Sequence, residues 1–369
     1  MKIYITIILL FISLISFEQA VQDLTITVDG TDRDFKLYVP SSYNPSSPAP
    51  LVFCFHGYGS NANTNFSYTG FRFIADTAGF VLIHPQGSLD ITGTPHFNVG
   101  WGLSNIDDIA FTQAMIDYAR DNYNINSDRI YSTGMSNGGF MSYQLACQLS
   151  NEIAAIASVT GSMSPQTFNN CNATHPTPVL QIHGTEDGTV PYDGDPLFTK
   201  AIDDVMLYWV NYNNCNSIPE TTLIEDINTN DQSTVDHLVY GNGANGSTVE
   251  LFKVYGGDHD WPGVFGNMDI NASIEVWKFF SRFDKNGALS VYENEALTSF
   301  KISPNPVQDV LTITHTFDKE SLFRILSIDG KEMTSGKMSD TSHSVNLSAL
   351  KSGAYLFVCE GAIEKFILK

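Results

Sequence analysis

Ser136 stands at the centre of the sequence GMSNG, residues 134–138, which has the spacing of a catalytic serine motif. The apolar residues 129–133 before it predict a short buried strand, and residues 139–147 after it have helical spacing. A serine held at such a strand-to-helix turn needs small neighbours, because the backbone folds back on itself there. The motif alone is weak, so the prediction of a nucleophile depends on the two residues that must assist it.

Two loops later in the chain could supply a base and a carboxylate for Ser136. Asp187 follows the predicted strand 179–183, and His259 follows the predicted strand 249–255. Serine, acid and histidine in this chain order, each after the carboxyl end of a strand, are typical of α/β-hydrolases. We therefore predict Ser136 as nucleophile and His259 as general base and then general acid. Asp187 is predicted to be the carboxylate that orients the imidazole.

Three other carboxylates occur in the same two loops. Glu186, Asp258 and Asp260 are weaker candidates for the orienting role. The two aspartates that flank His259 in sequence would point their side chains away from its ring, so we interpret them as solvated loop charges.

The oxyanion that develops in acyl transfer needs two N–H donors. Asn137 follows the nucleophile and could donate its backbone N–H from the start of the helix. The second donor should come from the glycine-rich loop after the predicted strand 51–55, where the backbone N–H of Tyr58 is best placed. Three histidines elsewhere are predicted to make structural hydrogen bonds rather than to transfer protons: His56, His84 and His183.

Two tryptophans fall near the predicted site. Trp101 precedes the start of a predicted helix, and Trp261 comes two residues after His259. Tryptophan usually packs in the core, but these positions favour substrate binding for at least one of the two. Asp107 and Asp108 are predicted to cap the N-terminus of the helix or to favour it electrostatically.

The chain of 369 residues, 43% of them hydrophobic, is long enough for one large core and a small second domain. Residues 1–20 are predicted to be a secretory signal peptide, because Lys2 is followed by an apolar run of about 15 residues. That run is short for a membrane span, and no later segment is long enough for one. We expect a soluble, exported protein.

Residues 1–299 carry the entire net charge of −21, because acidic and basic residues balance in 300–369. Such an acidic surface repels phosphate backbones, so nucleic acid is not an expected partner. No loop has the spacing of a calcium-binding motif, and no Cys/His cluster indicates another metal. We expect neither a metal nor a cofactor.

The five cysteines leave at least one unpaired. Export permits a disulfide, and Cys147 with Cys171 is the preferred pair. Cys54 lies within an apolar strand and is interpreted as a small core residue.

Residues 24–283 alternate strand-like and helix-like segments, which predicts an α/β fold with a mostly parallel sheet and helices on both faces. The predicted strands are residues 35–39, 51–55, 80–84, 129–133, 153–159, 179–183 and 249–255. The predicted helices include residues 108–123, 137–149 and 272–283. The polar residues 217–247 are interpreted as a long surface excursion that could wall a pocket.

Residues 285–299 have the composition of a linker between a catalytic domain, residues 21–284, and a C-terminal domain, residues 300–369. The C-terminal residues show short alternating strands and no helical periodicity, which predicts a small β-sandwich. Its predicted strands are residues 310–314, 323–328, 344–347, 354–358 and 366–368, with a turn at Asp329-Gly330.

Residues 24–283 resemble the secreted esterases that join feruloyl and acetylxylan esterases to polyhydroxybutyrate depolymerases. The resemblance runs through HG at 56–57, HPQG at 84–87, Trp101, DD at 107–108, RIY at 129–131, GMSNGG at 134–139, HGT-x-D at 183–187 and H-x-WPG at 259–263. It implies that Ser136, Asp187 and His259 are the catalytic triad. Members often carry a second cysteine near residue 240 that would pair with Cys215, and its absence here implies that Cys215 is unpaired.

Residues 300–369 resemble the C-terminal sorting module of the type IX secretion system. The resemblance rests on SPNP at 303–306, the turn at 329–330, residues 347–350 before GAY at 353–355, and a terminal strand at 365–369. It implies that the secretion machinery is a partner and that the protein crosses an outer membrane. Removal of the module would then leave the protein extracellular or attached to the outer cell surface.

These observations predict a secreted serine carboxylic-ester hydrolase that acts through an acyl-enzyme on feruloyl or acetyl esters of plant polysaccharides. The alternative substrate is extracellular polyhydroxybutyrate. A non-catalytic binding protein on a hydrolase scaffold is disfavoured, because all three triad residues are present. The C-terminal domain could instead bind polysaccharide, but it contains no tryptophan, which favours sorting.

Overall fold

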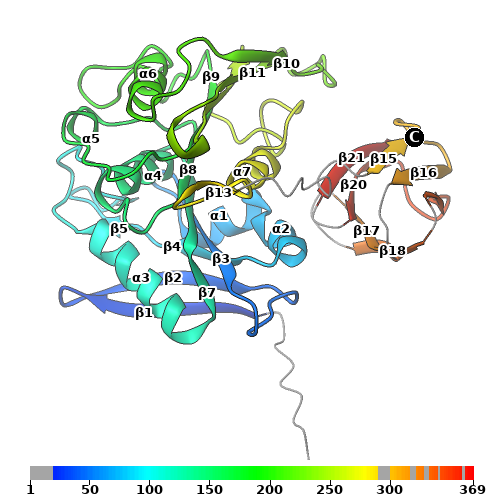
Figure 1. The fold of residues 1–369 in the computed structure, drawn as a ribbon, viewed down its shortest axis with the longest axis horizontal. Helices are drawn as coiled ribbons and strands as arrows, with labels where there is room; N and C mark the ends of the chain where they lie inside the picture. Colours follow the sequence, from blue (N-terminus) through cyan, green and yellow to red (C-terminus); the bar gives the residue numbers. More distant parts are fainter. Residues whose placement is uncertain (1–19, 290–299, 316–320, 328–331, 340, 360–361) are drawn as a thin grey trace, which may run out of the picture.

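The computed structural model describes residues 20–289 and, with gaps at 316–320, 328–331, 340 and 360–361, residues 300–369. A 10-stranded sheet runs through the N-terminal part in the order β1-β2-β4-β3-β7-β8-β9-β12-β11-β10 (Figure 1). Its strands are β1 (Ala20–Val28), β2 (Thr31–Val39), β3 (Ala49–Phe55), β4 (Val81–Pro85), β7 (Ile125–Met135), β8 (Ala155–Val159), β9 (Val179–Gly184), β10 (Glu220–Leu223), β11 (Thr234–Tyr240) and β12 (Val249–Tyr255).

The centre of the sheet is parallel and buried on both faces. Strands β4, β3, β7, β8, β9 and β12 pair in parallel, so their carboxyl ends lie along the same edge. All residues of β3, β4, β8 and β9 are buried. This explains why these strands are mostly apolar and do not alternate between apolar and polar residues. Antiparallel strands flank the parallel centre on both sides, β1 and β2 at one end and β11 and β10 at the other.

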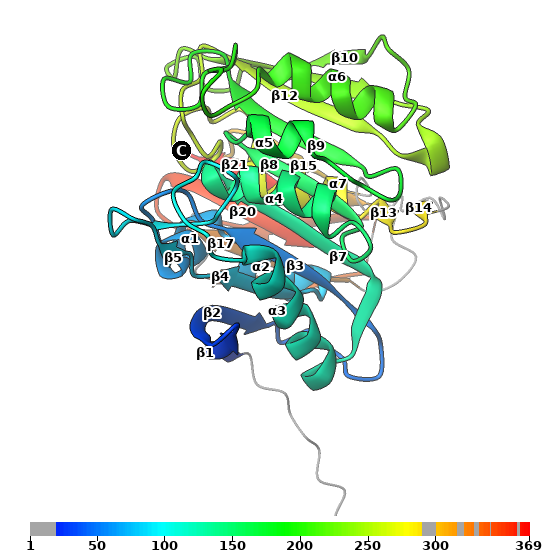
Figure 2. The ribbon, with the colours of Figure 1, turned by 90° about the vertical axis from the view of Figure 1, so that its left-hand side faces the viewer.

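Helices cover both faces of the sheet. On one face lie α3 (Asp108–Asn122), α4 (Asn137–Gln148) and α6 (Ile202–Tyr212), and on the other lie α2 (Phe71–Ala78) and α7 (Ala272–Phe280). In β3, Leu51 and Phe53 pack with the first group, whereas Val52 and Cys54 pack with the second, because successive strand residues point to opposite faces. Figure 2 looks onto the first face, with α3, α4 and α6 in front of the strands.

Shorter helical segments lie in the connections, namely α1 (Ala62–Thr69), α5 (Pro165–Asn169) and the 3-10 turn Ala244–Gly246. The predicted α/β fold with a mostly parallel sheet and helices on both faces is confirmed.

Four elements differ from the sequence prediction. No strand was predicted before residue 35, yet β1 pairs with β2 along nine residues. Residues 217–247, predicted as a surface excursion, contain β10 and β11, which extend the sheet. All four residues of β10 are exposed at the edge of the sheet, so its sequence lacks the apolar signal of a buried strand. The helix predicted to reach residue 283 ends at Phe280.

Two short hairpins lie beside the main sheet. The first joins β5 (Ser88–Leu89) to β6 (Pro95–His96), and the second joins β13 (Phe283–Asp284) to β14 (Gly287–Ala288). The predicted linker therefore begins within the second hairpin, and its residues 290–299 lie outside the described residues. The predicted signal peptide also lies outside them, apart from Ala20 at the start of β1.

The C-terminal part forms two small antiparallel sheets of its own, as predicted. One contains β15 (Phe300–Ser303), β16 (Val310–His315) and β19 (Ser342–Asn346), and the other contains β18 (Glu332–Met338), β17 (Ser321–Ser327), β20 (Gly353–Cys359) and β21 (Ala362–Leu368). Phe300 and Ile313 of the first sheet and Phe323 and Phe357 of the second share one apolar core. Strands β15 and β18 were not predicted, and the predicted turn at residues 329–330 lies outside the described residues.

Cys147 and Cys171, the predicted pair, form a disulfide that ties the end of α4 to the segment after α5. Cys54, Cys215 and Cys359 carry no disulfide. Within the described parts of the chain, none of the helices combines the length and the apolar character that crossing a membrane requires.

Candidate active site

Ser136 lies at the sharp turn between β7 and α4. Its backbone has φ 55° and ψ −121°, a conformation that residues other than glycine rarely adopt. Hydrogen bonds hold the turn in place: the Ser136 N–H donates to the carbonyl of Val159, and its own carbonyl accepts from Gly139 and Phe140. A strained serine at the carboxyl end of a central strand has the geometry of a nucleophile elbow.

Glycine at position 138 is required by the close crossing of β3 and α4. A Cβ atom added at Gly138 would lie 2.2 Å from the carbonyl oxygen of Phe55. On the other side of the nucleophile, a Cβ atom at Gly57 would lie 3.4 Å from the Cβ atom of Ser136. The loop that follows β3 therefore passes directly beside the serine.

Asp187 and His259 form a hydrogen-bonded pair at the same edge of the sheet, where β9 and β12 end. The Asp187 Oδ2 atom lies 2.8 Å from Nδ1 of His259. The Asp187 side chain is fully buried, whereas 18% of the His259 side chain is exposed. This leaves the second ring nitrogen of His259 available to exchange protons with a substrate or with a serine, as a general base requires.

The second oxygen of Asp187 fixes the carboxylate. Oδ1 accepts hydrogen bonds from the backbone N–H groups of Thr189 (2.9 Å) and Val190 (2.7 Å). Burial by itself raises the pKa of Asp187, but the hydrogen bond and charge of His259 outweigh it, and the net pKa lies below the ordinary value of 3.8. Asp187 is therefore an ionised acceptor for His259 at neutral pH.

The two loops that carry this pair are joined by further hydrogen bonds. The N–H groups of Thr185 and Glu186 donate to the carbonyls of Val254 and Gly257. Asp258 adds to this link, because its Oδ1 accepts from the N–H of Gly188 (3.1 Å) and from that of His259 (2.8 Å). Asp258 is exposed, as expected of a solvated loop charge, and its side chain also joins the two loops.

The other two candidate carboxylates, Glu186 and Asp260, form no hydrogen bond with His259 among the described residues. Glu186 is exposed. The Oδ2 atom of Asp260 accepts instead from the N–H of Asp258 at 3.3 Å. Asp187 is the residue that pairs with the histidine.

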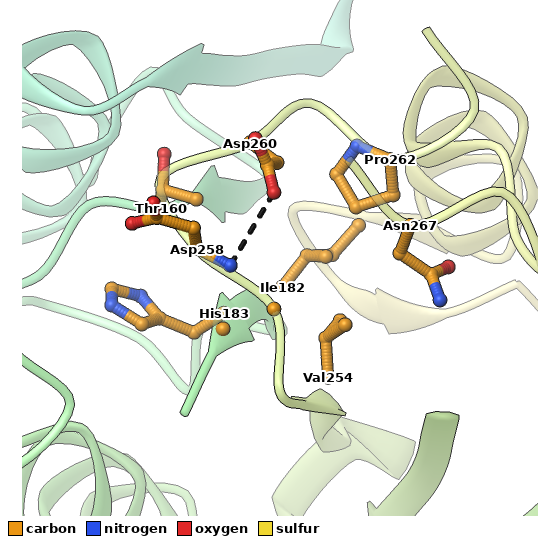
Figure 3. A pocket seen from close by; sticks show the side chains of 10 residues that line it. Thr160, Ile182, His183, Val254, Asp258, Asp260, Pro262 and Asn267 are labelled. Carbon is orange, nitrogen blue, oxygen red and sulfur yellow. Dashed lines mark hydrogen bonds between the residues drawn. The ribbon is translucent and has the colours of Figure 1, made fainter. Parts of the chain in front are cut away.

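A small cavity lies behind the catalytic pair. Figure 3 shows His183 and Asp258 on its wall, with Asp260 bonded to the N–H of Asp258. Its volume of about 10 Å³ is enough for a single water molecule and too small for an organic substrate.

His183 supports Asp187 from the side opposite to His259. Its Nε2 donates to the carbonyl of Val190 at 2.9 Å and lies 3.4 Å from Oδ2 of Asp187. Its Nδ1 accepts from the side-chain amide of Gln181 at 3.0 Å. Burial lowers the pKa of His183, so this histidine is neutral. It makes structural hydrogen bonds, as its sequence position indicated.

The residues predicted to form the oxyanion hole flank Ser136. Two hydrogen bonds fix the side chain of Asn137. Its Oδ1 accepts from the N–H of Phe97 at 2.7 Å, and its Nδ2 donates to the carbonyl of Phe97 at 3.0 Å. Tyr58 is anchored through its hydroxyl, which donates to Asp90 at 2.5 Å. Among the described residues, the backbone N–H groups of Tyr58 and Asn137 have no acceptor, which leaves both available to an oxyanion.

The remaining two histidines shape the loops around the site. His56 donates from Nδ1 to the carbonyl of Gly57 at 2.7 Å and accepts at Nε2 from the N–H of Gly87 at 2.9 Å. His84 lies 2.5 Å from the side-chain oxygen of Asn65. Burial lowers the pKa of His56 to about 4 and that of His84 to about 3, so both are neutral and structural.

The two tryptophans have different environments. Trp101 is half-buried, with its ring 5.0 Å from that of Phe140 and 6.5 Å from that of Tyr58. Trp261 has no exposed surface, since it packs against Phe71 and donates to the hydroxyl of Ser273 at 3.1 Å. The predicted role in substrate binding therefore does not fit Trp261, which is a core residue.

Asp107 and Asp108 also have different roles. Asp107 caps α3 by accepting from the N–H of Ala110 at 2.8 Å. Asp108 is buried and instead forms an ion pair with Arg33 at 2.6 Å. Its other oxygen accepts from the N–H of Asn98, so the pair anchors the segment that leads to Trp101. The sequence could not reveal the ion pair with Arg33, because its two residues are 75 positions apart.

Comparison with known families agrees with this geometry. Residues 104–219 match a family described as Phospholipase/Carboxylesterase, and residues 301–369 match one described as a secretion system C-terminal sorting domain. Part of the large α/β domain is thus similar to a family of esterases, and the C-terminal part is similar to a secretion sorting domain. Export of this hydrolase, predicted from the sequence, is confirmed by the sorting domain.

Individual relatives are esterases. The hydrolase is 28% identical over 72% of its chain to a bifunctional acetylxylan esterase/xylanase of Neocallimastix patriciarum, of which it covers 35%. It is 25% identical over 71% of its chain to feruloyl esterase D of Neurospora crassa, of which it covers 86%. It shares the fold of the acetyl xylan esterase from Aspergillus awamori, with a TM-score of 0.51, 15% identity and coverage of 71% of this chain and 99% of that one.

No group of three or more His, Cys, Asp or Glu side chains with suitable placement occurs in the parts of the chain that the structure describes. Sequence reasoning missed Arg33, and it missed the link that Asp258 makes between the two loops. Their sequence positions carry no signal for it, because each acts through a contact with a distant loop.

Proposed function

We propose that this protein is a carboxylic-ester hydrolase that acts through an acyl-enzyme on Ser136. The observation that carries the proposal is the buried Asp187–His259 pair at the edge of the sheet where the strained Ser136 turn also lies. A serine hydroxyl becomes a useful nucleophile only when a neighbouring base removes its proton.

In the proposed mechanism, Ser136 attacks the carbonyl carbon of the ester while His259 takes the hydroxyl proton. Asp187 stabilises the imidazolium that forms. The backbone N–H groups of Tyr58 and Asn137 donate to the oxyanion. The tetrahedral intermediate then collapses, and His259 protonates the departing alcohol. Water then attacks the acyl-enzyme while His259 takes a proton from it. The second tetrahedral intermediate collapses, the carboxylic acid leaves, and His259 returns the proton to Ser136.

For the substrate, we propose feruloyl or acetyl esters of plant polysaccharides. Support comes from the relatives named above, which are called acetylxylan and feruloyl esterases. The half-buried Trp101 beside Tyr58 offers an aromatic wall for a feruloyl ring or for a sugar face. Because the chain spans 35% of the first of these relatives, that protein's second activity is not carried over.

We also propose that residues 21–284 form the catalytic domain, that residues 285–299 link it to the sorting domain, and that residues 300–369 are removed after export. The mature hydrolase would then act outside the cell or on its surface, with a polymer-linked ester as substrate and without a nucleic-acid partner. The acidic charge of residues 1–299 is consistent with the last point, since it repels phosphates.

The test is hydrolysis of p-nitrophenyl acetate and methyl ferulate by the wild type and by Ser136→Ala. We expect the substitution to lower kcat by about 10⁴-fold or more, because the nucleophile and its base act as a unit. Activity retained by Ser136→Ala would overturn the assignment. Comparison of feruloyl, acetyl and 3-hydroxybutyrate esters would then separate a polysaccharide esterase from a polyester depolymerase.

A further inference from the structure

A second cavity is lined in part by the loop that carries Trp101 and does not include Asp187 or His259. It has a volume of about 390 Å³, within the range of cavities that bind small molecules. Gly100 and Gly102, the two neighbours of Trp101 in the chain, form part of its wall. The other walls come from the start of α3, from α4 and from α5, and α4 and α5 lie side by side (Figures 1 and 2).

The chemistry of this cavity is unusual, because side-chain amides dominate its lining. Five amide side chains line it, those of Asn98, Asn105, Gln144, Gln148 and Gln166, together with Ser104 and two carboxylates. Both carboxylates already have partners, because Asp107 caps α3 and Asp108 pairs with Arg33. None of the described residues that line it is Lys, Arg or His. An amide offers both donors and an acceptor without charge, so such a lining suits a neutral ligand rich in hydroxyl groups and does not suit an anion.

The floor of the cavity is held rigidly by its own hydrogen bonds. The Gln144 amide donates to the carbonyl of Asn98 and accepts from Thr167, both at 3.1 Å. The Asn98 amide donates to the carbonyl of Ile106 at 2.9 Å. Because these side chains are already ordered, they lose less conformational entropy when a ligand binds.

The rim, in contrast, has unused hydrogen-bonding groups. The side-chain amides of Asn105, Gln148 and Gln166 are exposed and have no partner among the described residues. Gln166 lies directly over Gly100, since a Cβ atom there would be 2.6 Å from its Oε1. Because Gly100 has φ +85° and no side chain, the amide can lie against the loop that carries Trp101.

We propose that this cavity is a binding subsite for a neutral oligosaccharide, which would hold the polysaccharide that carries the ester. Sugar hydroxyl groups each donate and accept, and they would pair with the free amides of the rim. Gln144 follows Ser136 by eight residues on α4, which places it about 12 Å from the nucleophile along the helix. At this distance the subsite would hold sugar units that flank the esterified one.

This inference rests on the proposed esterase function for its role, but its binding test does not. The probe is unesterified xylohexaose, and its Kd is measured by calorimetry with the full exported chain. Gln148→Ala and Gln166→Ala should each weaken binding about 5-fold, which corresponds to the loss of one hydrogen bond. Asn169→Ala is the matched control, because it removes an exposed amide from α5 that does not line the cavity.

Kinetics provide the second measurement. The two glutamine variants should raise KM for acetylated xylo-oligosaccharides about 5-fold and leave hydrolysis of p-nitrophenyl acetate unchanged, because the small ester does not reach the cavity. Absence of xylohexaose binding to the wild type, or equal binding by all three variants, would overturn the subsite. Binding that depends on Gln166 in a protein without esterase activity would uphold the subsite and overturn the proposed function.

Discussion

At the scale of single residues, the proposed chemistry depends on how Asp187 divides its two oxygens. One oxygen accepts from the N–H groups of Thr189 and Val190, and the other faces Nδ1 of His259. The first set of bonds fixes the carboxylate, and the second keeps the proton of the imidazole on Nδ1. Nε2 is then free to act as a base.

Asp187→Asn separates these two roles. The Asn side-chain oxygen can keep both backbone hydrogen bonds, but its NH₂ group would face His259 and favour the wrong tautomer. We expect kcat to fall about 10⁴-fold in a folded protein. Steady-state kinetics with p-nitrophenyl acetate, together with circular dichroism, check this outcome. A kcat within 10-fold of wild type would show that another carboxylate orients the histidine.

The same variant makes a prediction about pH and stability. The folded-state pKa of Asp187 lies below its ordinary value of 3.8, so its ionisation stabilises the fold above that pH. This contribution disappears as the pH falls through the lower folded-state value. The loss of unfolding free energy in Asp187→Asn should therefore be larger at pH 7 than at pH 3, as measured by urea denaturation. An equal loss at both pH values would contradict the lowered pKa.

The candidate triad stands out in the sequence because each member directly follows an apolar run. The order of Ser136, Asp187 and His259 then matched a known arrangement of strand ends. The fate of Trp261 was not predictable in this way. Its burial depends on Phe71, which is distant in the chain and becomes a neighbour only in the folded core.

At the scale of elements, the loops after β9 and β12 act as one unit, and Asp258 joins them. Both of its partners are backbone N–H groups that donate to the same oxygen, those of Gly188 and His259. The link between the two loops therefore needs a hydrogen-bond acceptor at the position of Oδ1 of Asp258 and does not need a negative charge.

Asp258→Ala and Asp258→Asn test whether geometry or charge matters. The alanine variant should lower kcat about 10-fold, because the loss of two hydrogen bonds lets the His259 loop shift. The asparagine variant keeps an oxygen acceptor and should stay within about 2-fold of wild type. Both values of kcat are measured with p-nitrophenyl acetate. Equal losses in the two variants would mean that the charge is what matters.

The ion pair of Arg33 and Asp108 anchors the segment that leads to Trp101. Both side chains are almost fully buried. Arg33→Ala leaves a buried carboxylate without its partner and should cost about 3–5 kcal/mol of unfolding free energy. The matched control is Lys278→Ala, which breaks the exposed pair with Glu275 and should cost about 0.5 kcal/mol or less. Urea denaturation compares the two, and similar losses would contradict a structural role for the buried pair.

The strands at the centre of the sheet were easier to predict than those at its edges. β3 and β9 are buried on both faces and are therefore mostly apolar, although β9 also buries Gln181 and His183. β10 exposes all of its residues, and β11 pairs with it at the same edge. The two strands are held together by backbone hydrogen bonds, which do not depend on side-chain type and so cannot be predicted from the hydrophobic pattern of the sequence.

At the scale of the whole molecule, the proposed catalytic residues and the match to a sorting domain lie in different parts of the chain. The sheets of residues 300–369 share no strand with the large sheet in the described residues. Residues 301–369 match a sorting domain, and they hold their own apolar core. The hydrolase core does not depend on them for any strand.

Deletion of residues 300–369 should therefore block export and spare hydrolysis. We expect the truncated protein to stay inside a host that has the secretion machinery, with kcat within about 2-fold of the full chain. The measurement is esterase activity in the medium, at the cell surface and in the lysate, with Ser136→Ala of the full chain as the inactive control. Export of the truncated protein would contradict the sorting role.

The central claim is that Ser136 is a nucleophile activated by His259. Labelling with a fluorophosphonate probe, followed by mass spectrometry of the modified peptide, tests it most directly. The proposed chemistry predicts a single labelled peptide that carries the probe on Ser136, with labelling lost in Ser136→Ala and slowed at least 100-fold in His259→Ala. An unlabelled wild type, a probe on another serine, or equal labelling rates with and without His259 would contradict the claim.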